Sequence, residues 1–406
     1  MKQLPDAPWR IEPGLIAVIA ALRDADGVDQ CRYVGGAVRD TLLGNAVMDV
    51  DLATPLLPGE VSRRLVNAGL KAVPTGIDHG TITAVADGRG YEITTLRRDV
   101  STDGRRATVE FSDRWEEDAA RRDFTINALY ASPVTGEIFD YFGGLSDLTR
   151  RHVRFIGDPA ARIAEDNLRI LRYFRFLSRF GERQLDAPAF AACRSAAASL
   201  KSLSRERIAA ELLQLLGTAA PSFVIGQMRE AGIFEAFLPE LREDAECSVA
   251  RLTTRETLHA IAPTGLRRLA AVLPVDAALA DQVAARLKLS RRARQTLSTL
   301  FALQVATPAN IRATAYYRGV EAARDAALLF ATDHDLEAAM GALAGWEPPV
   351  FPLKGGDLVR RGIGQGPQVA RTLRAIEEQW IAEGFPDAVR VAHLADQAAA
   401  LSGSEQ

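Results

Sequence analysis

Two adjacent glycines, followed within a few residues by two aspartates, constrain most strongly what this chain can fold into. Residues 31–34 predict a short strand, and Gly35-Gly36 separates it from a helix predicted over residues 37–43. Glycine lets a ligand approach the backbone closely, and a helix N-terminus offers unpaired N–H groups to an anion. The segment therefore predicts a strand–turn–helix unit whose turn can meet a phosphate.

Asp49 and Asp51 come next, at positions i and i+2 of a strand predicted over residues 47–52. Alternate residues of a strand point to the same face, and two neighbouring carboxylates repel each other unless a cation lies between them. Mg²⁺ suits such hard oxygen ligands. Glu92, on a strand predicted over residues 91–96, could add a third carboxylate. We predict Asp49, Asp51 and Glu92 as catalytic residues and Asp49 and Asp51 as ligands of Mg²⁺.

An Asp-x-Asp sequence by itself more often marks two solvent-facing acids at a strand edge. The upstream glycine pair favours a functional site over two solvent-facing acids. Arg39, one turn into the predicted helix, favours it too, because its guanidinium could hold a phosphate through two N–H groups. The combination favours a site for phosphate chemistry.

The character of the chain changes near residue 160. Residues 1–140 alternate short strands and helices, whereas residues 160–345 are rich in Ala, Leu and Arg with helical periodicity. A proline-rich break at residues 347–352 precedes a last helical segment. We predict an α+β chain with an N-terminal mixed sheet and helices, followed by an all-helical C-terminal half.

Several segments, in the same order, resemble one known family, the class II CCA-adding tRNA nucleotidyltransferases and bacterial poly(A) polymerases. The similar segments are residues 35–40, 49–51, 91–97, 121–129, 165–176 and 353–367. The resemblance implies a polymerase-beta-like nucleotidyltransferase head over residues 1–140 and a neck with nucleotide-selecting helices over residues 141–220. It also implies a helical body over residues 221–345 and a helical, tRNA-binding tail over residues 346–406.

In this family the choice of base falls to the counterparts of Asp166 and Arg169. The two residues lie at i and i+3, so one helix would present both on one face. A carboxylate can accept from the amino group of cytosine or adenine while a guanidinium donates to the ring nitrogen; uracil and guanine present the reverse pattern. Each mispaired buried polar group costs roughly 1–3 kcal/mol. Without the upstream motifs, the same residues would indicate only an amphipathic helix with salt bridges.

The resemblance extends to further nucleotide contacts. Arg122 is implied to contact phosphate and Asp123 to accept from a ribose 2′-OH, whereas Asn127 either completes that pocket or caps a turn. Arg172 and Arg175 could hold the triphosphate or the tRNA acceptor end. The predicted nucleotide-binding residues are Gly35, Gly36, Arg39, Arg122, Asp123, Asn127, Asp166, Arg169, Arg172 and Arg175.

The implied activity is the template-independent addition of C, C and A to the 3′ end of tRNA, from CTP and ATP, with Mg²⁺ as cofactor and release of pyrophosphate. The polar segment 99–118 is similar to the flexible loop that the family uses in switching from C to A, and its length favours full CCA addition. The alternatives are a poly(A) polymerase, a CC- or A-adding enzyme, and a catalytically silent RNA-binding relative. A poly(A) polymerase typically carries a basic Gly-Arg-Arg-Phe-like stretch, which residues 73–80 lack.

The composition and charge of the chain indicate its class, its compartment and its partners. With 48% hydrophobic and 25% charged residues, the chain has a globular profile, and no apolar run reaches the roughly 18 residues of a membrane span. We expect no signal peptide, and three scattered cysteines favour a reducing compartment, the cytoplasm. The net charge is only −3, but residues 150–183 hold nine arginines against four acids, an excess that can meet phosphates. The expected partners are the tRNA acceptor end, ATP and CTP, with no membrane and no obligate protein partner.

Overall fold

The computed structural model describes residues 3–103, 106–303, 307–364 and 366–403, and it divides into two compact units, Met1–Leu241 and Arg242–Gln406. Residues 104–105 and Gln365, which belong to two of the segments that resemble the family, lie outside the described residues. Each unit is described by itself. Among the described residues, no helix has the length and apolar character that a bilayer span demands.

The first unit is built on a seven-stranded sheet with the order β3-β4-β5-β2-β1-β8-β9. Its strands are β1 (Arg32–Val34), β2 (Asp51–Thr54), β3 (Lys71–Gly76), β4 (Thr81–Ala86), β5 (Arg89–Thr95), β8 (Leu129–Ala131) and β9 (Ile138–Asp140). The pair β2–β5 is parallel, and the other neighbouring pairs are antiparallel. The predicted mixed sheet is confirmed.

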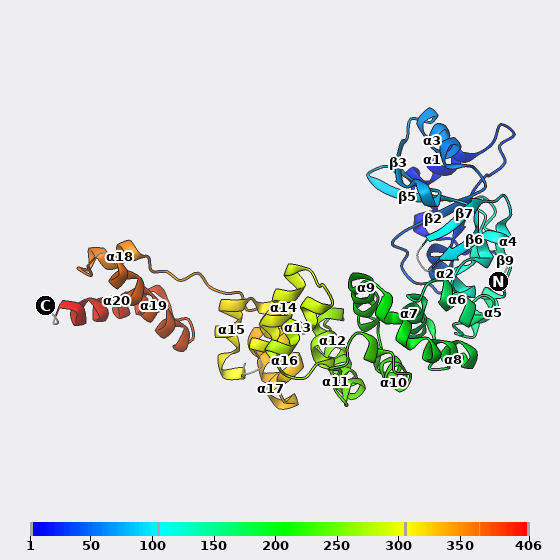
Figure 1. Cartoon of the computed structure of the whole chain (residues 1–406). Helices are drawn as coiled ribbons and strands as arrows, with labels where there is room; N and C mark the ends of the chain where they lie inside the picture. The colour runs from blue at the N-terminus through cyan, green and yellow to red at the C-terminus, as the bar shows by residue number, and fades with distance from the viewer. Residues whose placement is uncertain (1–2, 104–105, 304–306, 365, 404–406) are drawn as a thin grey trace. The chain divides into compact units, whose positions relative to one another are not determined.

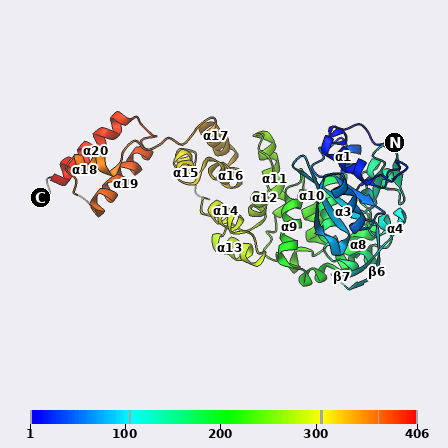
Figure 2. The ribbon, with the colours of Figure 1, turned by 90° about the horizontal axis from the view of Figure 1, so that it is seen from above.

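Helices α1 (Pro13–Leu22) and α3 (Pro58–Asn67) pack against each other and against β4 (Figures 1 and 2). Helix α2 (Gly36–Leu42) follows β1 directly and contacts β1 and β8. Val34, Ala53, Leu96 and Tyr130 belong to a buried cluster that joins β1, β2 and β8. The glycine pair and the aspartates therefore meet at one end of neighbouring central strands.

The polar segment 99–118, predicted as a loop, is mostly ordered structure. Its described residues form a two-stranded hairpin, β6 (Arg97–Asp103) and β7 (Arg106–Phe111), and then α4 (Trp115–Ala120). The expectation of a segment without strands is wrong, because residues of β6 pair with residues of β7, which the polarity of the sequence does not reveal. The role of this segment in switching from C to A stays a prediction.

The remaining helices of the first unit are short, and α7 is the most clearly amphipathic of those near the sheet. They are α5 (Gly144–Thr149), α6 (Pro159–Glu165), α7 (Arg169–Phe180), α8 (Ala187–Ser195), α9 (Arg205–Leu216) and α10 (Ser222–Glu230). Helix α7 buries Tyr173, Phe174 and Phe176, while its arginines recur every three or four residues on the polar side. That spacing produces a helix with an aromatic face in the core and a row of guanidinium groups beside it.

The second unit is all helical, as predicted for this part of the chain. Its helices are α11 (Ala245–Leu258), α12 (Gly265–Val272), α13 (Ala277–Arg286), α14 (Arg291–Ala302), α15 (Ile311–Arg318), α16 (Val320–Phe330), α17 (Asp333–Leu343), α18 (Gly355–Arg360), α19 (Pro367–Ala382) and α20 (Ala388–Gly403). Leu358, Trp380 and Leu394 anchor a buried cluster among α18, α19 and α20. The division into head, neck, body and tail stays a prediction.

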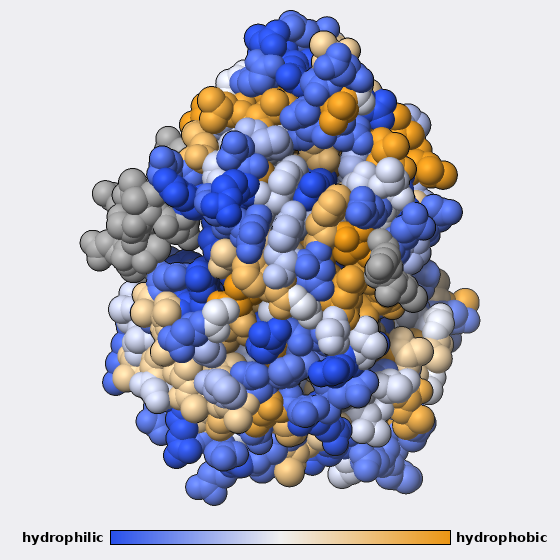
Figure 3. All heavy atoms as spheres, turned by 90° about the vertical axis from the view of Figure 1, so that its right-hand side faces the viewer, coloured by the Kyte–Doolittle hydropathy of each residue, from blue (hydrophilic) through white to orange (hydrophobic). Residues whose placement is uncertain are grey.

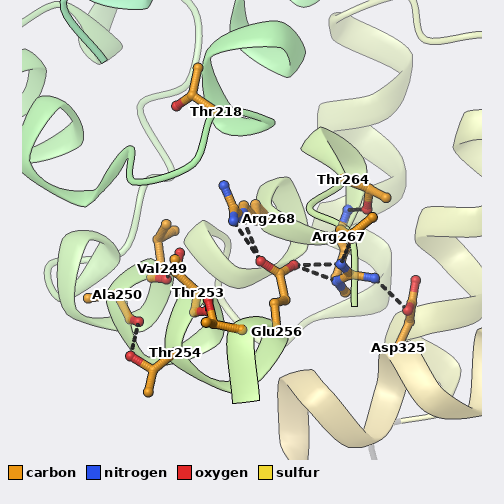
Figure 4. Close-up of polar contacts among 12 residues, drawn as sticks. Thr218, Val249, Ala250, Thr253, Thr254, Glu256, Thr264, Arg267, Arg268 and Asp325 are labelled. Atoms are coloured by element: carbon orange, nitrogen blue, oxygen red, sulfur yellow. Dashed lines mark hydrogen bonds and ion pairs between the residues drawn. The ribbon is translucent and has the colours of Figure 1, made fainter. Parts of the chain in front are cut away.

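A buried ionic cluster holds three helices of the second unit together (Figure 4). Glu256 of α11 is 2% exposed and accepts from Arg267 and Arg268 of α12. Arg267 also donates to Asp325 of α16 at 2.7 Å. Two cations therefore face two carboxylates in the core, which satisfies the condition for burying charge.

Candidate active site

Asp51 and Glu92 lie directly opposite each other on adjacent strands. Strands β2 and β5 are parallel, and Asp51 pairs with Glu92 in their register. Residues opposite each other in a sheet present their side chains on the same face. Asp51 is half-buried, whereas Asp49 and Glu92 are exposed. Strand β2 begins at Asp51, so Asp49 lies just before the strand and not within it, contrary to the strand predicted over residues 47–52.

The charges of the neighbouring carboxylates act on Asp51. Burial, and then the charges of Glu92 and Asp49, raise its pKa to about 6, while Arg122 acts in the opposite direction. Crowded carboxylates of this kind favour a cation between them. In the described part of the chain, no set of three or more His, Cys, Asp or Glu side chains converges as a complete ligand cage. An open pair of carboxylates still fits Mg²⁺, which usually takes one or two carboxylates and completes its shell with water and substrate phosphates.

Gly35 occupies a backbone conformation that requires glycine. It precedes α2 with φ +65° and ψ −117°, outside the regions that L-residues adopt. An added Cβ would stand 3.5 Å from the carbonyl oxygen of Asn127 and 3.6 Å from Nη1 of Arg122. The turn therefore lies against the second motif, and α2 covers Gly36–Leu42, one residue earlier than the helix predicted over residues 37–43.

Arg39 is buried, and its guanidinium belongs to a network of hydrogen bonds. Its guanidinium donates to both oxygens of Asp40, at 3.1 and 2.9 Å, and to Oδ1 of Asn127. It also lies 4.3 Å from the ring centroid of Phe180 in α7. Burial lowers its pKa against the opposing effect of Asp40. In this arrangement Arg39 joins α2 to α7, and its predicted phosphate contact stays a prediction.

Asp123 is the centre of the second motif. Its Oδ1 accepts from the backbone N–H of Phe124 and from Nδ2 of Asn127, and its Oδ2 accepts from Nε and Nη2 of Arg172 at 2.8 and 2.5 Å. Burial raises its pKa, but Arg172 and the hydrogen bonds outweigh this effect and hold the pKa below its usual range. Asn127 therefore bridges Arg39 and Asp123, a role closer to positioning than to a simple turn cap.

Arg122 extends from the second motif toward the carboxylates. Its Nε donates to the hydroxyl of Tyr130, and its Nη2 lies 3.1 Å from Asp118. Asp118 is 1% exposed and also accepts from Arg121. Sequence reasoning passed over Asp118, although its i, i+3 and i, i+4 spacing to Arg121 and Arg122 is the signal that could have found it.

Asp166 and Arg169 do not lie on one continuous helix, contrary to the sequence prediction. Asp166 terminates α6 in an extended conformation, and α7 begins at Arg169. The Asp166 side chain accepts from the backbone N–H of Leu168, which breaks the helix in the way typical of Asp at a turn. The turn still holds the pair close, because the N–H of Arg169 donates to the carbonyl oxygen of Asp166.

Each member of this pair has a partner within the first unit. Oδ2 of Asp166 accepts from Arg207 of α9 at 2.7 Å, and Arg169 donates to Glu165 at 2.5 Å and to the carbonyl oxygen of Arg121. Further along α7, Arg175 donates to Glu211 of α9 at 2.6 Å. Arg207 and Glu211 were not predicted, but they are four residues apart, as expected for one helix face turned toward α7.

Comparison with known proteins gives consistent results. Residues 31–154 match a family described as the Poly A polymerase head domain, and residues 184–244 match one described as the probable RNA and SrmB-binding site of polymerase A. The chain is 32% identical over 372 residues to CCA tRNA nucleotidyltransferase 1, mitochondrial, of Mus musculus, covering 88% of this chain and 84% of the relative. It is 33% identical over 375 residues to the CCA-adding enzyme of Levilactobacillus brevis, covering 87% of this chain and 90% of the relative.

A solved structure shows the same fold over nearly the whole chain. The CCA-adding enzyme of Bacillus stearothermophilus in complex with CTP superposes with a TM-score of 0.74 at 27% identity, covering 97% of this chain and 100% of that one. The Thermotoga maritima CCA-adding enzyme complexed with tRNA has the same fold at a TM-score of 0.69 and 20% identity, covering 98% and 99%. With its motifs in order and relatives matched along most of their length, this chain belongs to the family of CCA tRNA nucleotidyltransferases.

Proposed function

We propose that this chain adds C, C and A to the 3′ end of tRNA without a template, using CTP and ATP and releasing pyrophosphate. The observation that carries the proposal is the register pairing of Asp51 with Glu92, with Asp49 and Arg122 close enough to shift the pKa of Asp51. Relatives named as CCA-adding enzymes support it over most of the chain.

Nucleotidyl transfer in this family depends on a divalent metal, and we propose Mg²⁺ held by Asp49 and Asp51. When bound, the ion would supply activation of the attacking 3′-hydroxyl and neutralisation of phosphate charge. Glu92 adds negative charge on the same face of the sheet. Gly35 keeps the adjacent turn free of a side chain, and Arg122 adds a cation toward the carboxylates. These residues bind and orient the reacting groups.

For the choice of base we propose Asp166 and Arg169. Both groups hold hydrogen-bonding capacity that a base edge could use: the carboxylate accepts and the guanidinium donates. Glu165 and Arg207 hold them in place from either side, by the contacts described above. Arg39, Asp123, Asn127, Arg172 and Arg175 form the network that positions this pair relative to the sheet.

The acceptor is proposed to be the tRNA 3′ end, with no obligate protein partner. Relatives were solved with CTP, with ATP and with tRNA, which favours these substrates over polyadenylation of general RNA. A reducing compartment, the cytoplasm, is part of the proposal, because the three cysteines are free.

The decisive experiment supplies Mg²⁺, CTP and ATP with three tRNA transcripts that lack CCA, lack only the final A, or are complete. We expect addition that completes the first two and stops on the third. Unlimited A addition to any RNA would replace the proposal with polyadenylation, and CC-only or A-only products would identify a partial enzyme. Asp49→Ala or Asp51→Ala should abolish addition while leaving the circular dichroism spectrum unchanged.

A further inference from the structure

A hollow in the first unit lies beside the network of Arg39, Asp123 and Arg172 and shares Arg175 with it. It measures about 690 Å³, and its polar lining comes from Asn45, Arg175, Ser178, Arg179, Gln214 and, just after α9, Thr218. These residues belong to the segment after α2, to α7 and to the end of α9. The volume falls in the range of sites for small ligands, roughly 300–1,000 Å³.

The charges around the hollow are unbalanced. Among the described residues that line it, Arg175 and Arg179 are the charged ones, and no carboxylate is among them. Arg175 is engaged with Glu211 at 2.6 Å. Arg179 is 45% exposed at its side chain, and its contact with Asp40 is long, 3.4 Å. Asp40 already accepts two closer hydrogen bonds from Arg39. Arg179 therefore retains donors that can turn toward a ligand.

The ion-pair network beside the hollow also carries more positive than negative charge. Its cations are Arg39, Arg172, Arg175 and Arg179, and its carboxylates are Asp40, Asp123 and Glu211. Four guanidinium groups thus face three carboxylates, and the surplus positive charge lies at the hollow. A lining of two guanidinium groups, two amides and two hydroxyls suits a phosphate, since each of these groups is a hydrogen-bond donor.

The chain path connects this hollow to the candidate active site. Asn45 and Ala46 line it, and Asp49 follows Ala46 by three residues on the way into β2. Three residues span at most about 10 Å. The hollow therefore lies within reach of the nucleotides that precede a 3′ end reacting at Asp49.

We propose that this hollow binds a backbone phosphate of the RNA acceptor strand, upstream of the reacting 3′ end, through Arg179 and the amides of Asn45 and Gln214. The inference rests on the proposed function and assigns the path of its RNA substrate. The triphosphate of the incoming nucleotide carries the same chemistry, and the experiment separates the two sources.

The test uses the full chain with two single changes. Arg179→Gln removes the charge at nearly constant length, and Asn45→Asp places a negative charge at an exposed position without changing the side-chain shape. Arg63→Gln is the matched control, because the Arg63 side chain is 62% exposed, does not line the hollow and lies outside the arginine-rich residues 150–183. The dissociation constant of a tRNA transcript lacking CCA is measured without nucleotide at several salt concentrations, and the KM for CTP is measured separately.

We expect both changes to raise the Kd for tRNA by roughly tenfold and to leave the KM for CTP near its original value. Arg179→Gln should also reduce the slope of log Kd against log salt by about one, as the loss of one phosphate contact predicts. Arg63→Gln should change neither quantity. Thermal unfolding curves show whether each variant folds. If Arg179→Gln does not fold, Asn45→Asp still tests the inference.

An unchanged Kd for tRNA with both variants would overturn the inference. A raised KM for CTP with an unchanged Kd for tRNA would overturn it in favour of the triphosphate. These outcomes are distinct from failure of the proposed function, in which the unmodified protein would add no nucleotide to any transcript while its tRNA binding could still be measured.

Discussion

Asp123 and Arg172 form a bidentate ion pair, at 2.8 and 2.5 Å, that joins the segment following α4 to helix α7 across 49 residues of sequence. Asp123 is 8% exposed, and Arg172 also lies 3.6 Å from Glu211. This pair fixes the row of arginines on α7 relative to the turn at Gly35 and the sheet. The candidate nucleotide-binding residues are therefore held by one another before any ligand arrives.

Breaking this pair should destabilise the protein. Asp123→Asn leaves a guanidinium without its closest partner, and we expect a loss of about 2–4 kcal/mol in the free energy of unfolding. Urea denaturation followed by circular dichroism measures it. Arg98→Ala is the control, because Arg98 and Glu110 form a pair whose side chains are 53% and 56% exposed, and its loss should cost at most about 1 kcal/mol. Equal effects of the two changes would contradict a special role for the Asp123–Arg172 pair.

Arg169→Ala should relax the choice of base. The substitution removes the guanidinium that would donate to the ring nitrogen of cytosine or adenine. The advantage of CTP over UTP in kcat/KM should therefore fall by roughly 10-fold to 100-fold. Single-nucleotide addition assays with CTP and UTP give this ratio. Arg162→Ala is the matched control, since Arg162 also contacts Glu165 but precedes the turn. Full discrimination against UTP by Arg169→Ala would refute the assignment.

Asp118 should make stability depend on pH in the acid range. Burial raises its pKa, but Arg122, Arg121 and Tyr130 outweigh burial and bring the value to about 2, below the 3.8 of a free Asp. A lowered folded-state pKa contributes stability that is complete above the unfolded value and is lost as the pH falls toward 2. The difference amounts to about 2 kcal/mol. Urea midpoints between pH 6 and pH 2 should fall more for the original protein than for Asp118→Asn, and parallel curves would disprove the effect.

The buried ionic cluster of the second unit predicts a strong response to a small change. Glu256→Gln removes the carboxylate that Arg267 and Arg268 both contact in the core. We expect about 3 kcal/mol of destabilisation, because a buried charge without its partner is costly. Glu383→Gln, in an exposed pair with Arg390, should cost at most about 1 kcal/mol. Thermal melting of both variants decides this, and similar melting temperatures would show that the cluster is dispensable.

The surface carries exposed apolar side chains among hydrophilic ones. Viewed from the right-hand side of Figure 1, hydrophobic residues form separate patches among hydrophilic ones (Figure 3). The exposed apolar side chains of the first unit include Ile11 and Met48. Scattered residues of this kind are common on protein surfaces and mark no binding site by themselves.

The sequence by itself determined the local units of the site. The glycine pair predicted the turn between β1 and α2, and the turn adopts a conformation that only glycine takes readily. The spacing of apolar residues predicted the strands that carry Asp51 and Glu92, because side-chain direction in a strand alternates with every residue. These features depend on a few neighbouring residues, so they can be read directly from the chain.

Only the tertiary structure decided which groups meet. The parallel pairing that places Asp51 opposite Glu92 is a register between strands 41 residues apart, and no local pattern specifies it. The break at Asp166 was missed because its carboxylate competes with helical hydrogen bonding, which periodicity does not register. The partners of Arg172 and Arg179 were likewise undetermined, since Asp123 and Asp40 lie 49 and 139 residues away from them in sequence. Helical and strand periodicities set which way a side chain faces, and long-range packing sets what it faces.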